Sequence, residues 1–374
     1  MKKEYTALGL MSGTSGDGID ASIIKTDGNA KYQVIQDRYF EYDNEIYYSF
    51  HDLKEKINNK QDLIKLKNEI QDLDRKITIF HSKVVMETTG NNFVDLIGFH
   101  GQTIYHNSKE KISKQLGDGK LLSQLVKKDV IFNFRHNDIK NGGEGAPLTP
   151  IFHQLIASTL NFDLPICILN IGGIANISLI NKSVGSFEFS SKDIGPGNCL
   201  IDTWVRKNSD KKYDIDGILA LKGNRNEIIL EQAQELYQNR QNKDLLSFDV
   251  SDFDISFARG LSLEDGVATL TDFTANILSS ALTSLLKKDL KKEFTIILCG
   301  GGRKNKVLME KIKKNMSNYF IFKNIDDFNI DGDFVESQAF GYLAIRSFLK
   351  LPISFPSTTG CKEPCSGGTL VKNF

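Results

Sequence analysis

The sequence predicts an α/β fold in which two lobes repeat one β-β-β-α-β-α order. Its length favours two lobes, because 374 residues exceed the roughly 250–300 at which a single hydrophobic core stops growing. Two short apolar hairpins with glycine-rich turns open two halves of like order. Stretches of helical spacing separate each hairpin from later buried strands.

The first half begins with apolar strands at 8–11 and 19–26, joined by a turn rich in Gly, Ser and Thr. The remaining elements predicted for this half are a strand at 32–40, a helix within 60–90, and strands at 94–99 and 130–134. The second strand of that pair ends at Arg135, and the first ends at His100-Gly-Gln102-Thr.

The second half begins with a hairpin whose turn is Gly172-Gly-Ile-Ala-Asn176. The predicted strands are 166–171, 177–180, 186–189 and 294–299, and the predicted helices are 199–205, 266–288, 305–315 and 335–349. We expect one lobe to comprise residues 1–150 with the C-terminal stretch 335–374, and the other to comprise 151–334.

Composition excludes several classes of partner. Lys plus Arg and Asp plus Glu both number 47, so no electrostatic argument favours a nucleic acid or an anionic membrane surface. No signal-peptide core or apolar run of about 18 residues is visible, which predicts a soluble, cytoplasmic protein. The five cysteines are scattered, and reduced core thiols are expected. Cys361 and Cys365 suit a metal or a disulfide, but one pair supplies only two ligands.

Three glycine-rich loops indicate nucleotide binding when taken together. The turn around 13–18 lies in a hairpin, unlike a P-loop or a Rossmann turn, and its backbone N–H groups can hold phosphate oxygens beside Asp17 and Asp20. Any single turn of this kind is equally an ordinary tight hairpin. The turn at 172–176 is expected to face the first across a cleft, and the loop at 300–302 to lie against a nucleoside.

Three polar positions are candidates for catalysis or binding. Asp193 precedes a turn, Ile-Gly-Pro-Gly-Asn198, where a carboxylate acts as a general base or merely caps a helix or stabilises the turn. Arg135 suits a bidentate carboxylate contact or a surface salt bridge. Glu336 is a dipole partner in a first helical turn or a ligand contact.

Histidines are concentrated in one part of the first half. His100 and Gln102 are predicted at a strand end, and His106, His136 and His153 follow. A metal cluster is one hypothesis, but the spacings match no zinc pattern. Polar pocket lining or hydrogen-bonded core is the alternative.

These blocks together resemble the anhydro-N-acetylmuramic acid kinase family, within the superfamily of sugar kinases, Hsp70 and actin. The motifs occur in order along nearly the whole chain: GLMSGTSGDGID, GFHGQTIYH, QLGDG, FNFRHNDIKNGGEGAPLTPIFH, LNIGGIANIS, DIGPGN, ILCGGGRKN and ESQAFGYLA. The resemblance implies a two-lobed actin-like (ribonuclease H-like) fold with a central ATP cleft. It also implies a bacterial enzyme of cell-wall recycling that uses ATP and water to convert 1,6-anhydro-N-acetylmuramic acid into the 6-phosphate sugar.

The same resemblance implies a role for each site residue. Asp193 would be the catalytic base, Asp17 would lie near Mg²⁺, and Gly300, Gly301 and Gly302 would meet the adenosine. The residues expected at the ATP phosphates are Gly13, Thr14, Ser15, Gly16, Asp17, Gly18, Asp20, Gly172, Gly173 and Asn176. The residues expected at the sugar are His100, Gln102, Arg135 and Glu336. A homodimer is compatible with the resemblance.

Three departures from the family pattern concern the site. Gly16 replaces a larger apolar residue, which is expected to loosen the hairpin. Asn133 replaces an Asp before the Phe-Arg pair, and 247–257 is acidic where a Lys-Ser-x-Gly-Arg pattern is common. Two alternatives stay open: a kinase for another anhydro sugar such as levoglucosan, and a non-catalytic nucleotide-dependent sensor on the same fold.

Overall fold

The computed structural model describes residues 3–90, 92–183, 186–240, 246–286 and 293–373. The chain forms two compact units. The first comprises Met1–Phe162, Ser183–Ser191 and Asp333–Phe374, and the second comprises Asp163–Lys182 and Lys192–Gly332. The C-terminal residues therefore fold with the N-terminal ones.

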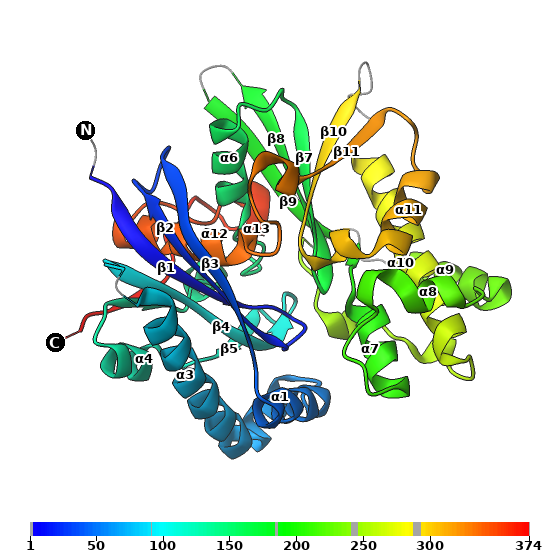
Figure 1. The fold of residues 1–374 in the computed structure, drawn as a ribbon, viewed down its shortest axis with the longest axis horizontal. Coiled ribbons are helices and arrows are strands. Elements are labelled where there is room, and N and C mark those ends of the chain that lie inside the picture. Colours follow the sequence, from blue (N-terminus) through cyan, green and yellow to red (C-terminus); the bar gives the residue numbers. More distant parts are fainter. Residues whose placement is uncertain (1–2, 91, 184–185, 241–245, 287–292, 374) are drawn as a thin grey trace. The chain divides into compact units, whose positions relative to one another are not determined.

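The first sheet has the strand order β12-β6-β4-β1-β2-β3, with β5 paired to β4 (Figure 1). Its strands are β1 Tyr5–Ser12, β2 Gly18–Thr26, β3 Tyr32–Glu41, β4 Leu96–Asn107, β5 Ile112–Leu116, β6 Val130–Phe132 and β12 Thr369–Val371. The helices of this part of the chain are α1 Asn44–Lys56, α2 Lys60–Lys65, α3 Lys67–Thr89, α4 Gly119–Val126, α5 His136–Lys140, α6 Pro150–Thr159, α12 Val335–Phe348 and α13 Pro356–Thr359.

The second sheet has the strand order β11-β10-β7-β8-β9. Its strands are β7 Ile166–Ile171, β8 Ile174–Ser183, β9 Ser186–Pro196, β10 Phe294–Cys299 and β11 Phe320–Asn324. The α-helices of the second unit are α7 Cys199–Asn208, α8 Ile218–Lys222, α9 Glu227–Arg240, α10 Leu263–Leu286 and α11 Lys306–Asn315.

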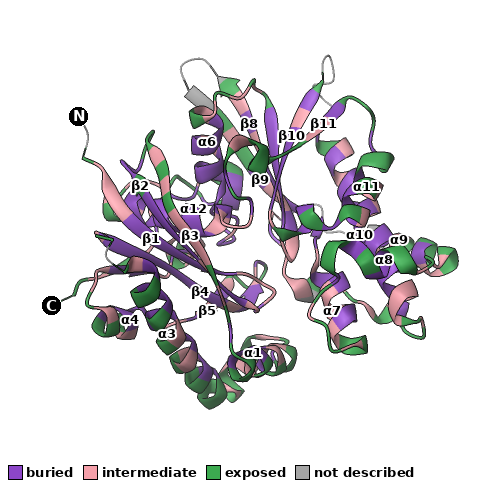
Figure 2. Cartoon of the chain, viewed as in Figure 1, coloured by how far each residue is buried: buried purple, intermediate pink, exposed green. Residues whose placement is uncertain are grey.

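The two sheets share one topology, which confirms the predicted duplication. In the first sheet β1 pairs with β2 antiparallel and with β4 parallel, and β4 pairs with β6 parallel. In the second, β7 pairs with β8 antiparallel and with β10 parallel, and β10 pairs with β11 parallel. Buried residues run along the central strands of both sheets (Figure 2). This is the doubled α/β order of the actin-like fold.

Helix α12 packs on the first sheet through positions where only glycine fits. An ideal Cβ on Gly9 of β1 would fall on the carbonyl oxygen of Ser337, and one on Gly98 of β4 would fall on that of Phe340. Residues 335 and 337–346 of α12 are all buried. The close approach to the sheet leaves most of this helix buried, in contrast to an amphipathic surface helix.

Several predicted boundaries are wrong. Strand β4 continues through His100 and Gln102 to Asn107, because Gly101 takes a positive φ of 77° and the chain goes on to pair with β5. Strand β9 does not end at 189 but continues through Asp193 to Pro196, so Asp193 lies within the strand. Helix α10 starts three residues before the predicted helix, whose last two positions, 287 and 288, lie outside the described residues.

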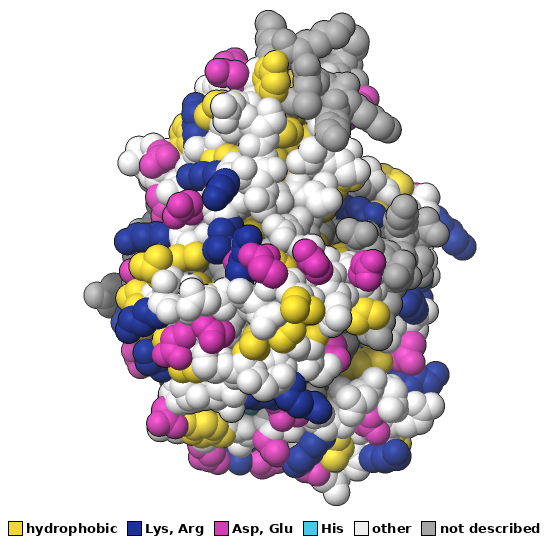
Figure 3. All heavy atoms as spheres, turned by 90° about the vertical axis from the view of Figure 1, so that its right-hand side faces the viewer, with side chains coloured by type: hydrophobic (Ala, Val, Ile, Leu, Met, Phe, Trp, Pro, Cys, Tyr) yellow, Lys and Arg dark blue, Asp and Glu magenta, His cyan; other side chains and the backbone are white. Residues whose placement is uncertain are grey.

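Acidic and basic side chains are interspersed on the face of the molecule shown in Figure 3. This mixture agrees with the equal numbers of acidic and basic residues in the sequence. Among the described residues, none of the helices combines the length and apolar character that crossing a bilayer requires.

Candidate active site

The first glycine hairpin is a compact turn closed by its own hydrogen bonds. The N–H of Gly16 donates to the carbonyl of Gly13 over 3.1 Å, and the hydroxyl of Ser15 donates to Asp17 Oδ1 over 2.5 Å. The carbonyl of Asp17 accepts from the N–H of Tyr42 at 2.9 Å and from the hydroxyl of Tyr39 at 3.1 Å. The far side of the turn is thereby anchored to the end of β3.

Buried polar groups hold the base of this hairpin. Ser12 Oγ lies 3.0 Å from the hydroxyl of Tyr42 and 3.3 Å from His81 Nε2. Burial lowers the pKa of His81 to about 4, although its contact with the carbonyl of Ile77 opposes the shift. His81 is therefore neutral near pH 7. Its Nδ1–H donates to that carbonyl, which leaves Nε2 to accept from Ser12.

Gly16 has a physical reason for being glycine in this chain. Its φ is +64°, and an ideal Cβ would fall on the ring of Phe50 from α1, which is fully buried. Phe50 thus fills the space that a side chain at position 16 would occupy. The expected loosening stays a prediction, but the turn has a packed neighbour at this point.

Gln102 joins the first hairpin to β4. Its Nε2 donates to the carbonyl of Gly13 over 2.8 Å, and it lies opposite Ser12 in the strand register. Because that bond fixes the amide orientation, Oε1 is left as the acceptor. Within the described part of the chain, this buried oxygen has no hydrogen-bond partner. Buried polar atoms are rarely left unpaired, so Oε1 is suited to a ligand hydroxyl, a ligand N–H or a water.

Arg135 and His100 form a fixed pair beside this hairpin strand. Arg135 donates from Nε and Nη2 to His100 Nε2, over 3.2 and 2.9 Å, and from Nη1 to the carbonyl of Gly145 over 2.8 Å. Arginine only donates, so Nε2 of His100 accepts, and Nδ1–H donates to the carbonyl of Gly101 over 2.7 Å. Burial, with the nearby guanidinium adding to it, holds the pKa of His100 well below its ordinary value.

Asn133 and Glu336, two further positions from the sequence analysis, have backbone environments that suit their side chains. Asn133 has a φ of 58°, a left-handed conformation that Asn tolerates well. Glu336 is half-buried in the first turn of α12, where a carboxylate is stabilised by the helix dipole.

In the second unit, the second glycine turn and the Asp-x-Gly-Pro-Gly-Asn segment are bound directly to each other. The carbonyl of Gly173 accepts from the N–H groups of Gly197 and Cys199, over 2.9 and 3.1 Å, and the carbonyl of Gly172 accepts from Asn198 over 2.8 Å. A Cβ on Gly197 would fall on the carbonyl oxygen of Gly172. The glycines therefore permit the close contact that joins the turn to the start of α7.

Asp193 is buried and its carboxylate is held by backbone. Its N–H donates to the carbonyl of Leu246 over 2.9 Å, and the N–H of Phe248 donates to its Oδ2 over 2.8 Å. The N-terminal cap position of α7 is Asn198, so Asp193 does not cap that helix. The segment that departs from the family pattern thus begins beside the predicted base, a neighbour that the sequence did not identify.

Asn176 is the third residue of β8 and lies opposite Asn170 of β7. In the described structure, its Oδ1 is buried without a hydrogen-bond partner. Half a turn of the amide would place Nδ2 there as a donor instead. Either atom gives the second hairpin an unused hydrogen-bonding group.

The third glycine loop is held by an arginine that the sequence analysis missed. Arg303 donates from Nε and Nη2 to the two carboxylate oxygens of Asp326, each over 2.7 Å, and from Nη1 to the carbonyl of Gly300 over 3.0 Å. This contact lowers the pKa of Asp326. The segment Gly-Gly-Gly-Arg303 contains the signal, because a buried arginine next to a glycine loop is suited to fix its backbone.

The predicted residues fall into two groups. Gly13–Asp20, His100, Gln102, Arg135 and Glu336 belong to the first unit, and Gly172, Gly173, Asn176, Asp193 and Gly300–302 belong to the second. That the two hairpins face each other across a cleft stays a prediction. The histidine cluster is not a metal site in the described structure, since the one group of three close ligand-type residues found there contains no histidine.

A duplicated α/β fold with glycine hairpins at corresponding strand junctions and a buried aspartate defines the sugar-kinase class of the actin-like ATPases. The sequence profile described as anhydro-N-acetylmuramic acid kinase matches residues 5–373. This chain belongs to that family.

Three similar proteins are all named anhydro-N-acetylmuramic acid kinase. The one from Pelagibacter ubique is 54% identical over 376 residues and covers 100% of both chains. The one from Zymomonas mobilis is 35% identical and covers 97% of this chain and 99% of its own. The one from Agrobacterium fabrum is 36% identical and covers 100% of both.

Proposed function

We propose that this chain transfers the γ-phosphoryl group of ATP to O6 of 1,6-anhydro-N-acetylmuramic acid while water opens the anhydro bridge. The products are N-acetylmuramic acid 6-phosphate and ADP, in cell-wall recycling. Family membership supports the substrate, and the buried, backbone-held carboxylate of Asp193 supports the chemistry.

Asp193 is the proposed general base. It would take a proton from the water that attacks the anomeric carbon, as O6 leaves that carbon and is captured by phosphorus. A separate general acid is then unnecessary, because the departing oxygen receives a phosphoryl group in place of a proton. The Phe248 N–H orients the carboxylate, which favours one position for the attacking water.

The two glycine hairpins are the proposed phosphate site. Backbone N–H groups of such turns suit anionic oxygens, and phosphoryl transfer depends mainly on positioning and charge neutralisation. Asp17 and Asp20 offer carboxylates of the type that Mg²⁺ prefers, and both are half-buried on the first hairpin. Mg²⁺ would neutralise phosphate charge there. The partnerless amide atoms of Gln102 and Asn176 fit a site completed by ligand or water.

Arg135 is proposed to select the sugar. The lactyl group of an anhydromuramic acid carries a carboxylate, whereas levoglucosan has none. A guanidinium held in place by His100 and Gly145 is matched to that charge. We therefore expect ADP release to be stimulated by anhydro-N-acetylmuramic acid far more than by levoglucosan.

The test is Mg²⁺-dependent, sugar-stimulated ADP release by the full chain and by Asp193→Asn. The variant keeps an oxygen for the Phe248 N–H but loses basicity, so turnover should fall by about 10²–10⁴-fold while ATP affinity is retained. Asp163→Asn, at an exposed carboxylate of the same unit, is the matched control. Near-normal turnover in Asp193→Asn would show that the base is another group.

Two alternatives are separated by the same assay. Greater stimulation by levoglucosan would favour a kinase for a neutral anhydro sugar. Nucleotide binding without ADP release with either sugar would favour a sensor. A cytoplasmic location and a homodimer remain proposals, and light scattering of the purified chain tests the second.

A further inference from the structure

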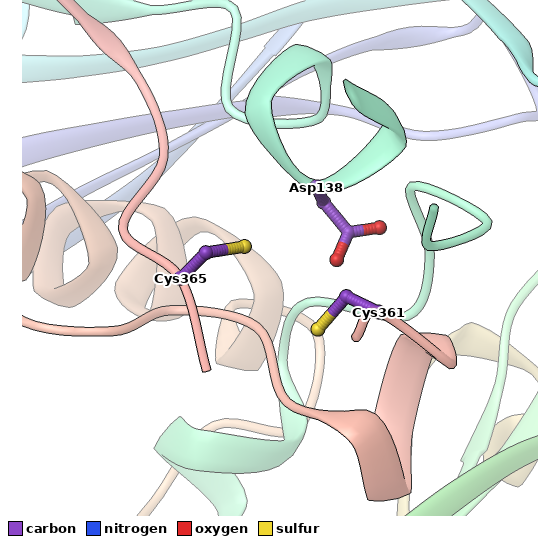
Figure 4. A group of neighbouring side chains, drawn as sticks. All are labelled: Asp138, Cys361 and Cys365. Carbon is purple, nitrogen blue, oxygen red and sulfur yellow. The ribbon is translucent and has the colours of Figure 1, made fainter. Parts of the chain in front are cut away.

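Asp138, Cys361 and Cys365 converge in the first unit. One ligand-type atom from each lies within 4.8 Å of the other two, and all three residues are buried. Asp138 comes from α5, whereas both cysteines come from the segment after α13 (Figure 4). The sequence analysis considered only the cysteine pair, since nothing in the spacing connects it to residue 138.

Asp138 is a buried carboxyl group that has no basic partner among the described residues. It is 1% exposed, and no lysine or arginine forms a salt bridge with it in the described part of the chain. Its two oxygens accept one hydrogen bond each, from the N–H of Gly145 over 2.7 Å and from the hydroxyl of Thr359 over 2.6 Å. Buried carboxylates are normally paired or bound to a metal, so this site lacks a positive charge.

Hydrogen bonds orient Asp138, Cys361 and Cys365 but leave lone pairs on their oxygen and sulfur atoms available to a metal. Each carboxylate oxygen has a second lone pair beyond the bond from Gly145 or Thr359. The thiol of Cys361 donates to the carbonyl of Glu363 over 3.2 Å, and Cys365 Sγ lies 3.1 Å from the hydroxyl of Ser354. Such outer contacts are typical of groups that orient metal ligands.

We propose that Asp138, Cys361 and Cys365 bind a soft divalent cation, Zn²⁺, as a structural site. Two sulfurs and one carboxylate oxygen are accepted zinc ligands, and a water completes a tetrahedral set. Both thiols become thiolates on binding and release two protons to solvent. The group as a whole keeps a net charge of −1, but the carboxylate of Asp138 would then be paired directly with a cation.

The proposed site would tie the C-terminal segment to the loop that carries Arg135. Gly145 donates its N–H to Asp138 and accepts from Arg135 Nη1 through its carbonyl. The Thr359 carbonyl also accepts from the N–H of Glu144 over 2.8 Å. Zinc would thus stabilise the backbone that positions the proposed sugar-binding arginine.

Zinc binding should depend on pH, because zinc binds cysteine as the thiolate and both thiol protons must leave. Zinc affinity should therefore fall as pH decreases.

The experiment measures zinc content of the reduced, full-length chain by elemental mass spectrometry after dialysis, and cobalt substitution by visible absorption. One zinc per chain is expected, with thiolate-to-cobalt charge-transfer bands. Both should be lost in Cys361→Ser and in Cys365→Ser. Two separate variants are used so that a folding defect in one leaves the other as the test. Cys199→Ser, at a buried cysteine of α7, is the control that should keep the metal.

The structural role is tested by measuring the thermal midpoint of unfolding with and without a chelator. The chelator should lower the thermal midpoint of the wild type and of Cys199→Ser, and should leave the Cys361→Ser midpoint unchanged. The proposal is wrong if the reduced wild-type chain takes up no zinc, or if Cys361→Ser and Cys365→Ser both take up as much as the wild type. Because neither result depends on turnover, failure here is distinguishable from failure of the proposed kinase activity.

Discussion

At the scale of single residues, hydrogen-bond partners decide the chemical state of the candidate groups. His100 is neutral because burial disfavours its charge, and its tautomer is set by a donor on one nitrogen and an acceptor on the other. It therefore serves as an acceptor that orients Arg135. A carbonyl on the opposite side, from Gly145, completes that orientation.

Arg135→Lys should separate charge from orientation. Lysine keeps the positive charge but loses the planar fork that contacts His100 and Gly145. We expect kcat/KM for the sugar to fall by about 10–100-fold, equivalent to about 1.4–2.7 kcal/mol, with KM for ATP unchanged. Steady-state kinetics with each substrate varied in turn measures this.

Arg38→Lys is the control for Arg135→Lys. Arg38 on β3 also donates to a backbone carbonyl, that of Glu87, but its side chain is 41% exposed. It should leave both constants unchanged. An equal rise in KM for ATP and in KM for the sugar in Arg135→Lys would contradict a role confined to the sugar.

The sequence indicated which residues are candidates for the site better than it indicated the contacts that hold them. Asp193 and Arg135 were selected by their motifs, and both lie among fixed backbone contacts. The Phe248 N–H that holds Asp193 comes from 55 positions away along the chain. Backbone donors carry no side-chain signature, so no pattern in the sequence indicates such a partner.

At the scale of elements, the first hairpin is specified by a neighbour as well as by its own glycines. Phe50 of α1 occupies the space next to Gly16, whose positive φ already disfavours other residues. The helix spanning 44–56 was not predicted from the sequence. The sequence analysis could therefore identify Gly16 only as a departure from the family pattern, without a packing reason. In the structure, the absent side chain of Gly16 and the bulky ring of Phe50 complement each other.

Gly16→Ala tests this pairing. The left-handed backbone and the overlap with Phe50 should together lower the free energy of unfolding by about 2–4 kcal/mol. Urea denaturation measures the change. Gly13→Ala in the same turn is the control, because an ideal Cβ there has only the Ser15 hydroxyl nearby, at 3.7 Å. Equal stability losses in the two variants would argue against the role of Phe50.

Strand ends were predicted least well, and the reason is physical. The sequence predicted that β4 ends at 99 and that the third strand of the second half ends at 189, because polar residues and glycines follow. Glycine at 101 permits a kink without ending the pairing, and β9 continues through a buried Asp193. Apolar periodicity identifies strands that face a core, whereas polar strand residues that line a site break that pattern.

At the scale of the whole molecule, the repeat of one α/β unit could be predicted from the sequence. The order of hairpins, helices and strands is the same in both halves, although their side chains differ. Both sheets place the first strand of a hairpin at the centre, with parallel partners added on the other side. Strand β11 was not predicted, yet the same topology requires it as the counterpart of β6. Fold therefore followed from element order, and the contacts inside each site followed only from the structure.

Buried histidines should make the stability of the chain depend on pH. Burial lowers the pKa of His81 and His153 from an ordinary 6.5 to about 4, and holds that of His100 well below 6.5. The unfolded chain therefore binds protons first as pH falls below 6.5, and the folded chain follows only near pH 4. The unfolding free energy must decrease across that window.

Between about pH 7 and 5, this linkage predicts a loss of about 2 kcal/mol for each of His81 and His153. Asp74 and Asp214 act in the opposite direction, because burial raises their pKa values above 3.8. Denaturant titrations at each pH measure the loss. His81→Gln keeps a polar group beside Ser12 without a titrating ring, so its pH dependence should be smaller by about 2 kcal/mol. A wild-type unfolding free energy that stays constant from pH 7 to 5 would mean that these rings take up protons in the folded chain.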